Sequence, residues 1–165
     1  MSRPVVRPAG PADLPAVAAI YAHFVRTSAA TFDIEEPAIS YWQAKLDSTA
    51  VGDHFLVACD DDEALAFAYS ASFRPRPAYD RTRETSVYVA PAATGNGLGT
   101  RLYLELLDLL RQDEVHLVVA VVTKPNPASN ALHRTLGFTE VGTLDEVGFK
   151  FGAYLSSTWF QLRLS

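Results

Sequence analysis

The sequence lacks most of the features that mark a secreted, membrane-spanning or nucleic-acid-binding protein. Its 165 residues include a single cysteine, Cys59, so no disulfide can form within the chain. No apolar run approaches the roughly 18 residues of a transmembrane helix, and the first residues have no signal-peptide stretch. The net charge of −5 favours neither nucleic acid nor an anionic membrane as a partner. These absences leave a cytoplasmic protein as the expectation.

The few residues that often mark redox or metal chemistry are sparse here. Cys59 ends the apolar run that starts at Phe55, where a small core residue is the favoured interpretation over a nucleophile. His23, His54 and His116 match no metal spacing, so no metal site is expected and these three are interpreted as structural.

What the chain does have is one domain's length and an ordinary apolar content of 48%, which suits a single domain over residues 1–165. Hydrophobic periodicity predicts the order β α α β β β α β α β β. Strands are expected at 3–7, 55–59, 65–73, 85–90, 115–122, 139–147 and 154–163.

The helices and loops follow from capping and breaking residues. We expect Asp13 and Ser40 to cap the first two helices, and Gly52 and Asp53 to end the second. Two further helices are expected at 97–111 and 127–136, and a loop at 148–152. The continuous β-branched run at 115–122 is typical of a strand buried on both faces in a parallel pairing. The prediction is a mixed α/β (α+β) fold, whose mostly antiparallel sheet of about seven strands has one central parallel pair and helices on both faces.

The chain is organised around residues 84–111, which are typical of a strand, a glycine-rich turn and a helix. Such a turn exposes main-chain N–H groups at the positive end of a helix dipole, which suits a phosphate. A tight turn whose glycines only supply positive φ is the alternative. A dinucleotide fingerprint is disfavoured because Gly95, Gly97 and Gly99 are too closely spaced, and no Gly-Lys-Ser/Thr follows as in a P-loop.

The loop at 74–83 carries four arginines in an otherwise acidic chain. Recognition of a local anion and simple solvation are both open interpretations of this loop, because arginine forks match carboxylate or phosphinate oxygens.

Taken together, these motifs resemble the GNAT superfamily of acetyl-CoA-dependent N-acetyltransferases. The turn Thr94-Gly-Asn-Gly-Leu-Gly99 is similar to its first signature, and Asn126 to Phe138 to its second, with His133 where many members have tyrosine. Segments 30–33, 73–79, 84–89, 131–133 and 148–152 narrow the resemblance to the phosphinothricin / methionine sulfoximine N-acetyltransferase group. The resemblance runs from about residue 3 to 163 and implies the GNAT fold, with a sheet that splays after strand 85–90.

The resemblance implies acetyl-CoA as co-substrate. Main-chain groups of Val87 and Val89, with Tyr88 between them, would pair with pantetheine, and the amides of the turn would hold the pyrophosphate. The usual basic residues of this turn are Thr94 and Asn96 here, which leaves the main-chain donors in place; Arg101 is a candidate nearby cation. The implied coenzyme-binding residues are Val87, Tyr88, Val89, Thr94, Gly95, Asn96, Gly97, Leu98, Gly99, Thr100, Asn126, Ser129 and Thr135.

The chemistry needs a base, because an ammonium has no lone pair with which to attack a thioester. The motif match makes Glu84 the base, directly or through water, and His133 the acid that protonates the departing thiolate. The reverse assignment, with His133 as the base, stays open because the ordinary pKa of histidine lies nearer neutral.

The implied acceptor is a small amino-acid analogue such as phosphinothricin, methionine sulfoximine or methionine sulfone, acetylated on its α-amino group. The resemblance gives it the contacts Phe32, Arg74, Arg76, Tyr79, Thr85 and Ser86. Lys150 either reaches this site or closes a dimer interface, and a homodimer is expected through the aromatic stretch Tyr154–Phe160. Alternatives are another amine or a protein N-terminus as acceptor, a coenzyme-binding module without catalysis, and a nucleotide-binding oxidoreductase.

Overall fold

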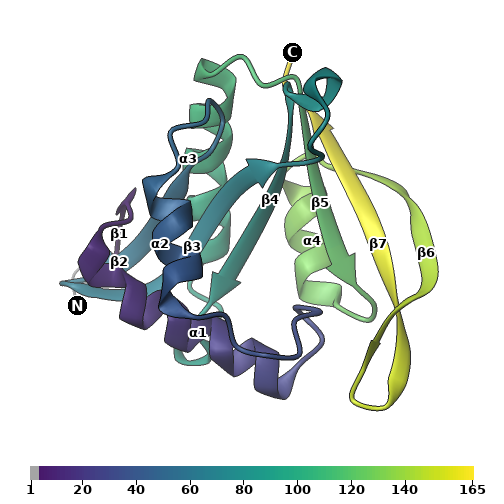
Figure 1. Cartoon of the computed structure of the whole chain (residues 1–165), viewed down its shortest axis with the longest axis horizontal. Helices are drawn as coiled ribbons and strands as arrows, with labels where there is room; N and C mark the ends of the chain where they lie inside the picture. Colours follow the sequence, from purple (N-terminus) through teal and green to yellow (C-terminus); the bar gives the residue numbers. More distant parts are fainter. Residues whose placement is uncertain (1–3) are drawn as a thin grey trace.

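The computed structural model describes residues 4 to 165 and has the expected order of elements (Figure 1). The strands are β1 Val5–Pro8, β2 Phe55–Asp60, β3 Glu63–Ser72, β4 Thr82–Val89, β5 Leu117–Thr123, β6 Thr139–Lys150 and β7 Ala153–Arg163. The helices are α1 Leu14–Thr27, α2 Ile39–Asp47, α3 Leu98–Gln112 and α4 Pro127–Thr135. The first strand was expected from residue 3, which lies outside the described residues.

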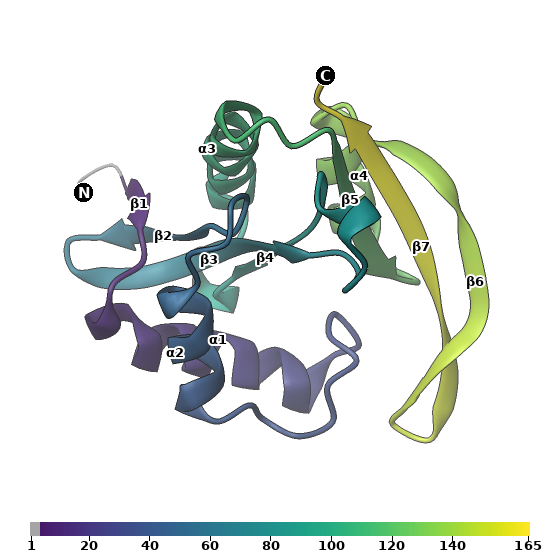
Figure 2. The same ribbon diagram turned by 45° about the horizontal axis from the view of Figure 1, so that its top comes forward.

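The strands form one sheet in the order β1-β2-β3-β4-β5-β7-β6. Among the described strands, only β4 and β5 pair in parallel, which confirms the predicted central pair. Helices α1 and α2 cover one face of the sheet, and α3 and α4 cover the other (Figure 2). In the part of the chain that the structure describes, no helix is long and apolar enough to cross a membrane.

Each face of the sheet has its own hydrophobic core. On one face, Leu102, Leu106 and Leu110 of α3 are fully buried, because their spacing places them on one side of the helix. On the other face, Trp42 of α2 packs edge-on against Phe67 of β3. These two layers hold the central strands β3 and β4 from both sides.

Neither predicted side-chain cap is made. Asp13 occupies the N-cap position of α1, but its carboxylate does not cap that helix. It accepts from the Gly10 N–H at 2.7 Å and forms an ion pair with Arg7 at 2.7 Å, and the Arg7 guanidinium lowers its pKa. Helix α2 begins at Ile39, with Ala38 at its N-cap, and ends at Asp47, before Gly52. In the first case, ion pairing across the chain outweighed the local capping preference.

The expected loop at 148–152 is also wrong, because the last two strands continue into a tight hairpin. β6 runs to Lys150 and β7 starts at Ala153, which leaves a turn of Phe151 and Gly152. Both turn residues have positive φ, +53° and +73°, as the two-residue turns that match strand twist require. The hairpin therefore reaches well beyond the rest of the sheet (Figure 1).

Candidate active site

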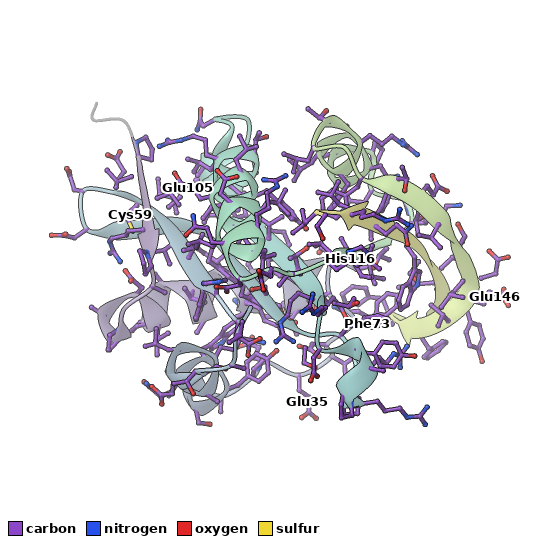
Figure 3. The ribbon with its side chains drawn as sticks, turned by 90° about the horizontal axis from the view of Figure 1, so that it is seen from above. Glu35, Cys59, Phe73, Glu105, His116 and Glu146 are labelled. Atoms are coloured by element: carbon purple, nitrogen blue, oxygen red, sulfur yellow. The ribbon has the colours of Figure 1, made fainter. Side chains whose placement is uncertain are left out.

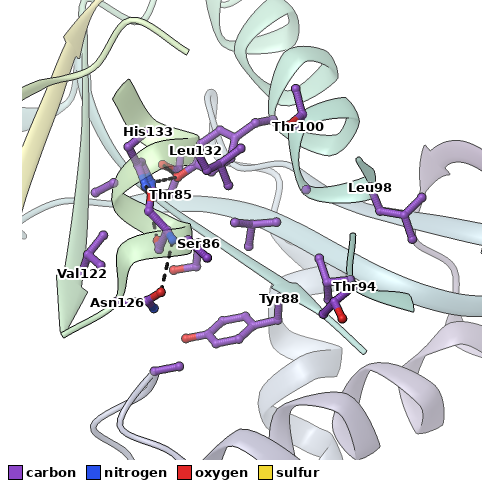
Figure 4. A pocket seen from close by; sticks show the side chains of 18 of the residues that line it. Thr85, Ser86, Tyr88, Thr94, Leu98, Thr100, Val122, Asn126, Leu132 and His133 are labelled. Carbon is purple, nitrogen blue, oxygen red and sulfur yellow. Dashed lines mark hydrogen bonds between the residues drawn. The ribbon is translucent and has the colours of Figure 1, made fainter. Parts of the chain in front are cut away.

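The candidate site lies where the central parallel pair separates. β4 pairs with β5 only from Thr82 to Glu84, opposite Leu117 to Val119. From Thr85 onward, β4 pairs with β3 alone, so its other edge is open. A cavity of about 380 Å³ lies there, lined by β4, the start of α3, β5 and α4. Figure 4 shows His133 and Asn126 on one side of this cavity and Thr94 and Leu98 on the other.

The glycine turn borders this cavity and leaves its main-chain donors accessible. Gly95 and Gly97 have φ of +82° and +72°, so glycine is the residue that adopts these positions without strain. Gly97 is the N-cap of α3, no side chain caps the helix, and its first turn has no acidic residue. The free N–H groups and the helix dipole make this end of α3 suitable for an anion.

Most of the coenzyme-binding residues expected from the sequence line the cavity. These are Val87, Tyr88, Val89, Thr94, Gly95, Gly97, Leu98, Gly99, Thr100, Asn126 and Ser129. Asn96 and Thr135 do not: Asn96 donates to the Ala93 carbonyl at 3.2 Å, and Thr135 is exposed near the end of α4. Asn126 caps α4, because its Oδ1 accepts from the Ser129 N–H at 3.1 Å.

Glu84 is the last β4 residue before the strands separate, and its surroundings favour the neutral acid. Burial raises the pKa of Glu84, while Arg74 and Lys45 oppose this shift through their positive charges. Successive β4 side chains alternate between the two faces. Thr85 faces Tyr103 of α3, so Glu84 and Ser86 face the side of α1 and α2.

His133 is buried behind the cavity in a chain of hydrogen bonds. Its Nδ1 lies 2.7 Å from the Ser129 carbonyl, which only accepts, so Nδ1 carries the proton. Burial lowers the pKa of His133, and the neutral ring accepts at Nε2 from the Tyr103 hydroxyl at 2.9 Å. The Thr85 hydroxyl lies 2.8 Å from the same Tyr103 oxygen and donates to it.

The residues expected to contact the acceptor lie mainly in two loops, which the structure places in separate groups. Phe32 contacts Gly148 so closely that a Cβ on Gly148 would lie 2.6 Å from the Phe32 ring. In the other loop, Phe73 packs against Tyr79 and Trp159, with ring centroids 5.5 and 6.4 Å apart (Phe73 is labelled in Figure 3).

Arg74, Arg76 and Tyr79 line a second cavity of about 420 Å³ in the latter loop. Of the expected acceptor contacts, only Thr85 and Ser86 border the main cavity. The expected acceptor contacts are therefore divided between the main cavity and this second cavity.

Lys150 does not border the main cavity, and it is only 4% exposed, so its side chain lies inside the chain. Its ammonium donates to the Ser28 and Thr31 carbonyls at 2.8 Å each. Lys150 thereby ties the hairpin tip to the loop that carries Phe32.

Sequence reasoning missed Tyr103 and Lys45. Tyr103 is fully buried and joins Thr85 to His133. Lys45 lies within the electrostatic field of Glu84. A signal was present for Lys45, since it stands three positions after the buried Trp42 and so shares the inward side of α2.

The remaining candidates lie apart from the site. Cys59 is 2% exposed in the core under α1, at the end of the sheet away from Phe73 (Figure 3), and burial raises the pKa of its thiol. His54 contacts Asp113 at 2.7 Å and His116 contacts Ser165 at 3.0 Å. Residues 4–165 contain no group of three or more metal-ligating side chains.

The sequence of this chain is similar to those of known acetyltransferases. Residues 17–138 match the family described as Acetyltransferase (GNAT) family. The chain is 40% identical over 155 residues to phosphinothricin N-acetyltransferase of Alcaligenes faecalis, covering 93% of this chain and 79% of that protein. It is 38% identical over 161 residues to the L-methionine sulfoximine/L-methionine sulfone acetyltransferase of Pseudomonas paraeruginosa, covering 96% and 94%.

A solved structure agrees over nearly the whole chain. The GNAT superfamily phosphinothricin acetyltransferase (Pat) from Sinorhizobium meliloti, in complex with AcCoA, superposes with a TM-score of 0.93 at 32% identity. The match covers 99% of this chain and 90% of that one.

Proposed function

The chain belongs to the acetyltransferase (GNAT) family and is an N-acetyltransferase, and we propose that it acetylates the α-amino group of a small amino-acid analogue with acetyl-CoA. Phosphinothricin, methionine sulfoximine and methionine sulfone are the proposed acceptors. The observation that carries the proposal is the position of Glu84, at the point where β4 loses its partner and the main cavity begins.

The main cavity fits acetyl-CoA, whose thioester supplies the acetyl group. The open edge of β4 offers main-chain groups to the pantetheine amides. The free N–H groups at Gly97, Leu98 and Gly99 suit the pyrophosphate, and no acidic side chain in that turn opposes it. Leu98, Val122 and Leu132 line the main cavity and offer apolar contacts to the pantetheine chain.

Glu84 is the proposed base. Its carboxylate takes a proton from the acceptor ammonium, which frees the lone pair for attack on the thioester carbonyl. Burial raises the pKa of Glu84, which makes the carboxylate a stronger proton acceptor than an exposed glutamate, and the positive charges of Arg74 and Lys45 favour its ionised form.

For His133, the geometry supports a positioning role over either proton-transfer role. To donate from Nε2 the ring would need a second proton, which burial disfavours. As a neutral acceptor, His133 fixes the Tyr103 hydroxyl at the wall of the main cavity. We propose that His133 orients this hydroxyl toward the thioester of bound acetyl-CoA.

The acceptor is proposed to lie between Glu84 and the loop at 73–79. The exposed guanidinium groups of Arg74 and Arg76 and the Tyr79 hydroxyl offer donors to the phosphinate, sulfoximine or sulfone oxygens. Phe32 supplies an apolar wall from the opposite loop. The names of the relatives from Alcaligenes faecalis and Pseudomonas paraeruginosa support acceptors of this class.

A homodimer is also proposed. The β6–β7 hairpin exposes Val147, Phe149, Phe151 and Tyr154 by 51 to 66%, and β6 is an edge strand. The expected contact through Tyr154–Phe160 needs correction, because Phe160 is fully buried in the core and cannot reach a partner. Tyr154 remains available from that stretch.

The test is a screen of acceptors with acetyl-CoA, in which released coenzyme A is detected as a free thiol. We expect turnover with phosphinothricin, methionine sulfoximine or methionine sulfone. We expect Glu84→Gln to lose about 10²- to 10⁴-fold in kcat/KM. If none of the three acceptors releases coenzyme A, the substrate proposal is wrong; if Glu84→Gln keeps full activity, the base assignment is wrong.

A further inference from the structure

Lys45 of α2 has a half-buried ammonium that forms no ion pair with the described residues. Its Nζ lies 4.0 Å from the centroid of the Tyr69 ring and 4.9 Å from that of Tyr41. Among residues 4–165 it forms no hydrogen bond and no ion pair. Lys150 differs from Lys45, because its buried ammonium donates to two carbonyls. A half-buried cation held only by aromatic faces can still accept an anionic partner.

Lys45 lies on the same side of the sheet as Glu84. Tyr69 of β3 stands opposite Ser86 of β4, and two residues further along the same face Ala71 stands opposite Glu84. The ammonium over Tyr69 is therefore a near neighbour of the proposed base. Burial lowers the pKa of Lys45, and the charges of Asp53 and Glu84 oppose this shift. Lys45 in turn acts on Glu84, whose pKa its positive charge lowers.

The space beside this ammonium is open. A cavity of about 280 Å³ lies between α2 and β3, lined among others by Tyr41, Lys45, Tyr69 and Ala71. Asp53 and His54 also line this cavity, and the Asp53 carboxylate lies 3.7 Å from Arg83 and forms no ion pair with Lys45. The Lys45 ammonium is thus left available on the side that faces Ala71 and Glu84.

An α-amino acid whose amine lies at Glu84 favours a cation nearby, because its carboxylate would lie close to the Glu84 carboxylate. Its amine and carboxylate are bonded to the same carbon, so an amine at Glu84 brings the substrate carboxylate close to the carboxylate of the base. Two like charges at that distance repel strongly in a partly buried site. Arg74 and Lys45 are the two cations that act on Glu84, and Arg74 belongs to the loop with Arg76 and Tyr79.

We propose that the Lys45 ammonium binds the α-carboxylate of the acceptor, while the arginine-rich loop binds the oxygens at the far end of its side chain. This inference rests on the proposed function and divides the acceptor's two polar ends between α2 and the loop at 73–79. It makes Lys45 the residue that distinguishes an amino acid from a simple amine.

The test compares one pair of acceptors that differ only in the carboxylate. Methionine sulfone is assayed beside its decarboxylated counterpart, 3-(methylsulfonyl)propan-1-amine, with wild-type protein and Lys45→Met. We expect Lys45→Met to lower kcat/KM for methionine sulfone by about 10-fold or more, mainly through KM, as for a lost hydrogen bond between charged groups. Both acceptors are assayed at a pH well above the acidic limb of the wild-type profile, so that the effect of Lys45 on the pKa of Glu84 does not limit either rate. The amine should then change by less than about 2-fold, because it has no carboxylate to lose.

Two further variants keep the result interpretable. Lys45→Arg should restore much of the preference for methionine sulfone. Gln43→Met, on the same helix and bonded only to Asp47 at 2.9 Å, should leave both acceptors unchanged. The midpoint of thermal unfolding and the KM for acetyl-CoA show whether Lys45→Met is folded with an intact coenzyme site.

The outcomes separate the two proposals. An equal loss on both acceptors, or an unchanged KM for methionine sulfone, overturns the role of Lys45 and leaves the proposed function standing. If wild-type protein acetylates neither compound nor any other amino-acid analogue, the proposed function is wrong, and the inference that rests on it is wrong as well.

Discussion

At the scale of single residues, the proposed base Glu84 predicts how the reaction depends on pH. Burial raises its pKa, so the carboxyl group stays protonated up to a higher pH than the ordinary value of about 4.3. The base must be ionised to accept a proton. Activity is therefore present above the raised pKa and is lost as the pH falls through it.

We expect kcat/KM plotted against pH to show an acidic limb with its midpoint above the ordinary glutamate value. Glu84→Gln should abolish this limb along with most of the activity. Glu105→Gln, which changes an exposed glutamate of α3 (Figure 3), is the matched control and should leave the profile unchanged. An acidic limb that persists in Glu84→Gln would assign it to another group.

The hydrogen bond between Tyr103 and His133 gives a second prediction. We expect Tyr103→Phe and His133→Phe each to lower kcat by about 10-fold or more, since the first removes the hydroxyl and the second removes the acceptor that orients it. Because both act through one hydroxyl group, the double variant should be little worse than either single variant. Steady-state kinetics of the three variants measure this.

Two observations would contradict the shared role. Additive losses in the double variant would mean that His133 acts independently of Tyr103. Full kcat in Tyr103→Phe would mean that the hydroxyl has no part in the reaction. Tyr154→Phe, at an exposed tyrosine, is the control for loss of a hydroxyl group.

At the scale of elements, the hairpin tip contacts the loop after α1, which carries the proposed acceptor contact Phe32. Lys150 holds the Ser28 and Thr31 carbonyls, and Gly148 leaves room for Phe32. We expect Lys150→Met to destabilise the protein by about 1–3 kcal/mol, because both carbonyls lose a charged donor. The acceptor KM should rise more than the KM for acetyl-CoA.

Lys124→Met is the matched control, since Lys124 is exposed and its ammonium contacts neither carbonyl. Thermal unfolding and the two KM values give the measurement. Equal increases in both KM values would show that the contact supports the whole cleft and not the acceptor side in particular.

The sequence predicts the elements better than the contacts between them. Periodicity was sufficient for the order of strands and helices, the parallel pair and the glycine turn, because these depend on neighbours close in the chain. The wrong caps at Asp13 and Ser40 show a tertiary ion pair and a shifted helix start overriding local preference. The roles of Lys150 and Tyr103 were not predictable, since their partners lie 119 and 30 positions away.

At the scale of the whole molecule, the exposed hairpin predicts assembly. A chain of 18.0 kDa that pairs through β6 and β7 should show twice that mass in light scattering after size-exclusion chromatography. We expect the double change Phe149→Glu and Tyr154→Glu to give a monomer, because charge replaces two residues that are 60 and 66% exposed.

Val5→Glu is the control for this experiment, because Val5 is 60% exposed on β1 at the opposite edge of the sheet. It should not change the mass. A monomeric wild-type protein, or a dimer that survives the double change, would contradict assembly through the hairpin.

The alternation of side chains along β4 limits how this enzyme can change in length during evolution. Glu84 and Ser86 face the side of α1 and α2, whereas Thr85 faces α3 and joins the buried chain to Tyr103. A single residue inserted or deleted within this strand would exchange the two sets. The strand can therefore vary by substitution more readily than by insertion or deletion, whereas a change of length in the loop at 74–81 would leave the alternation intact.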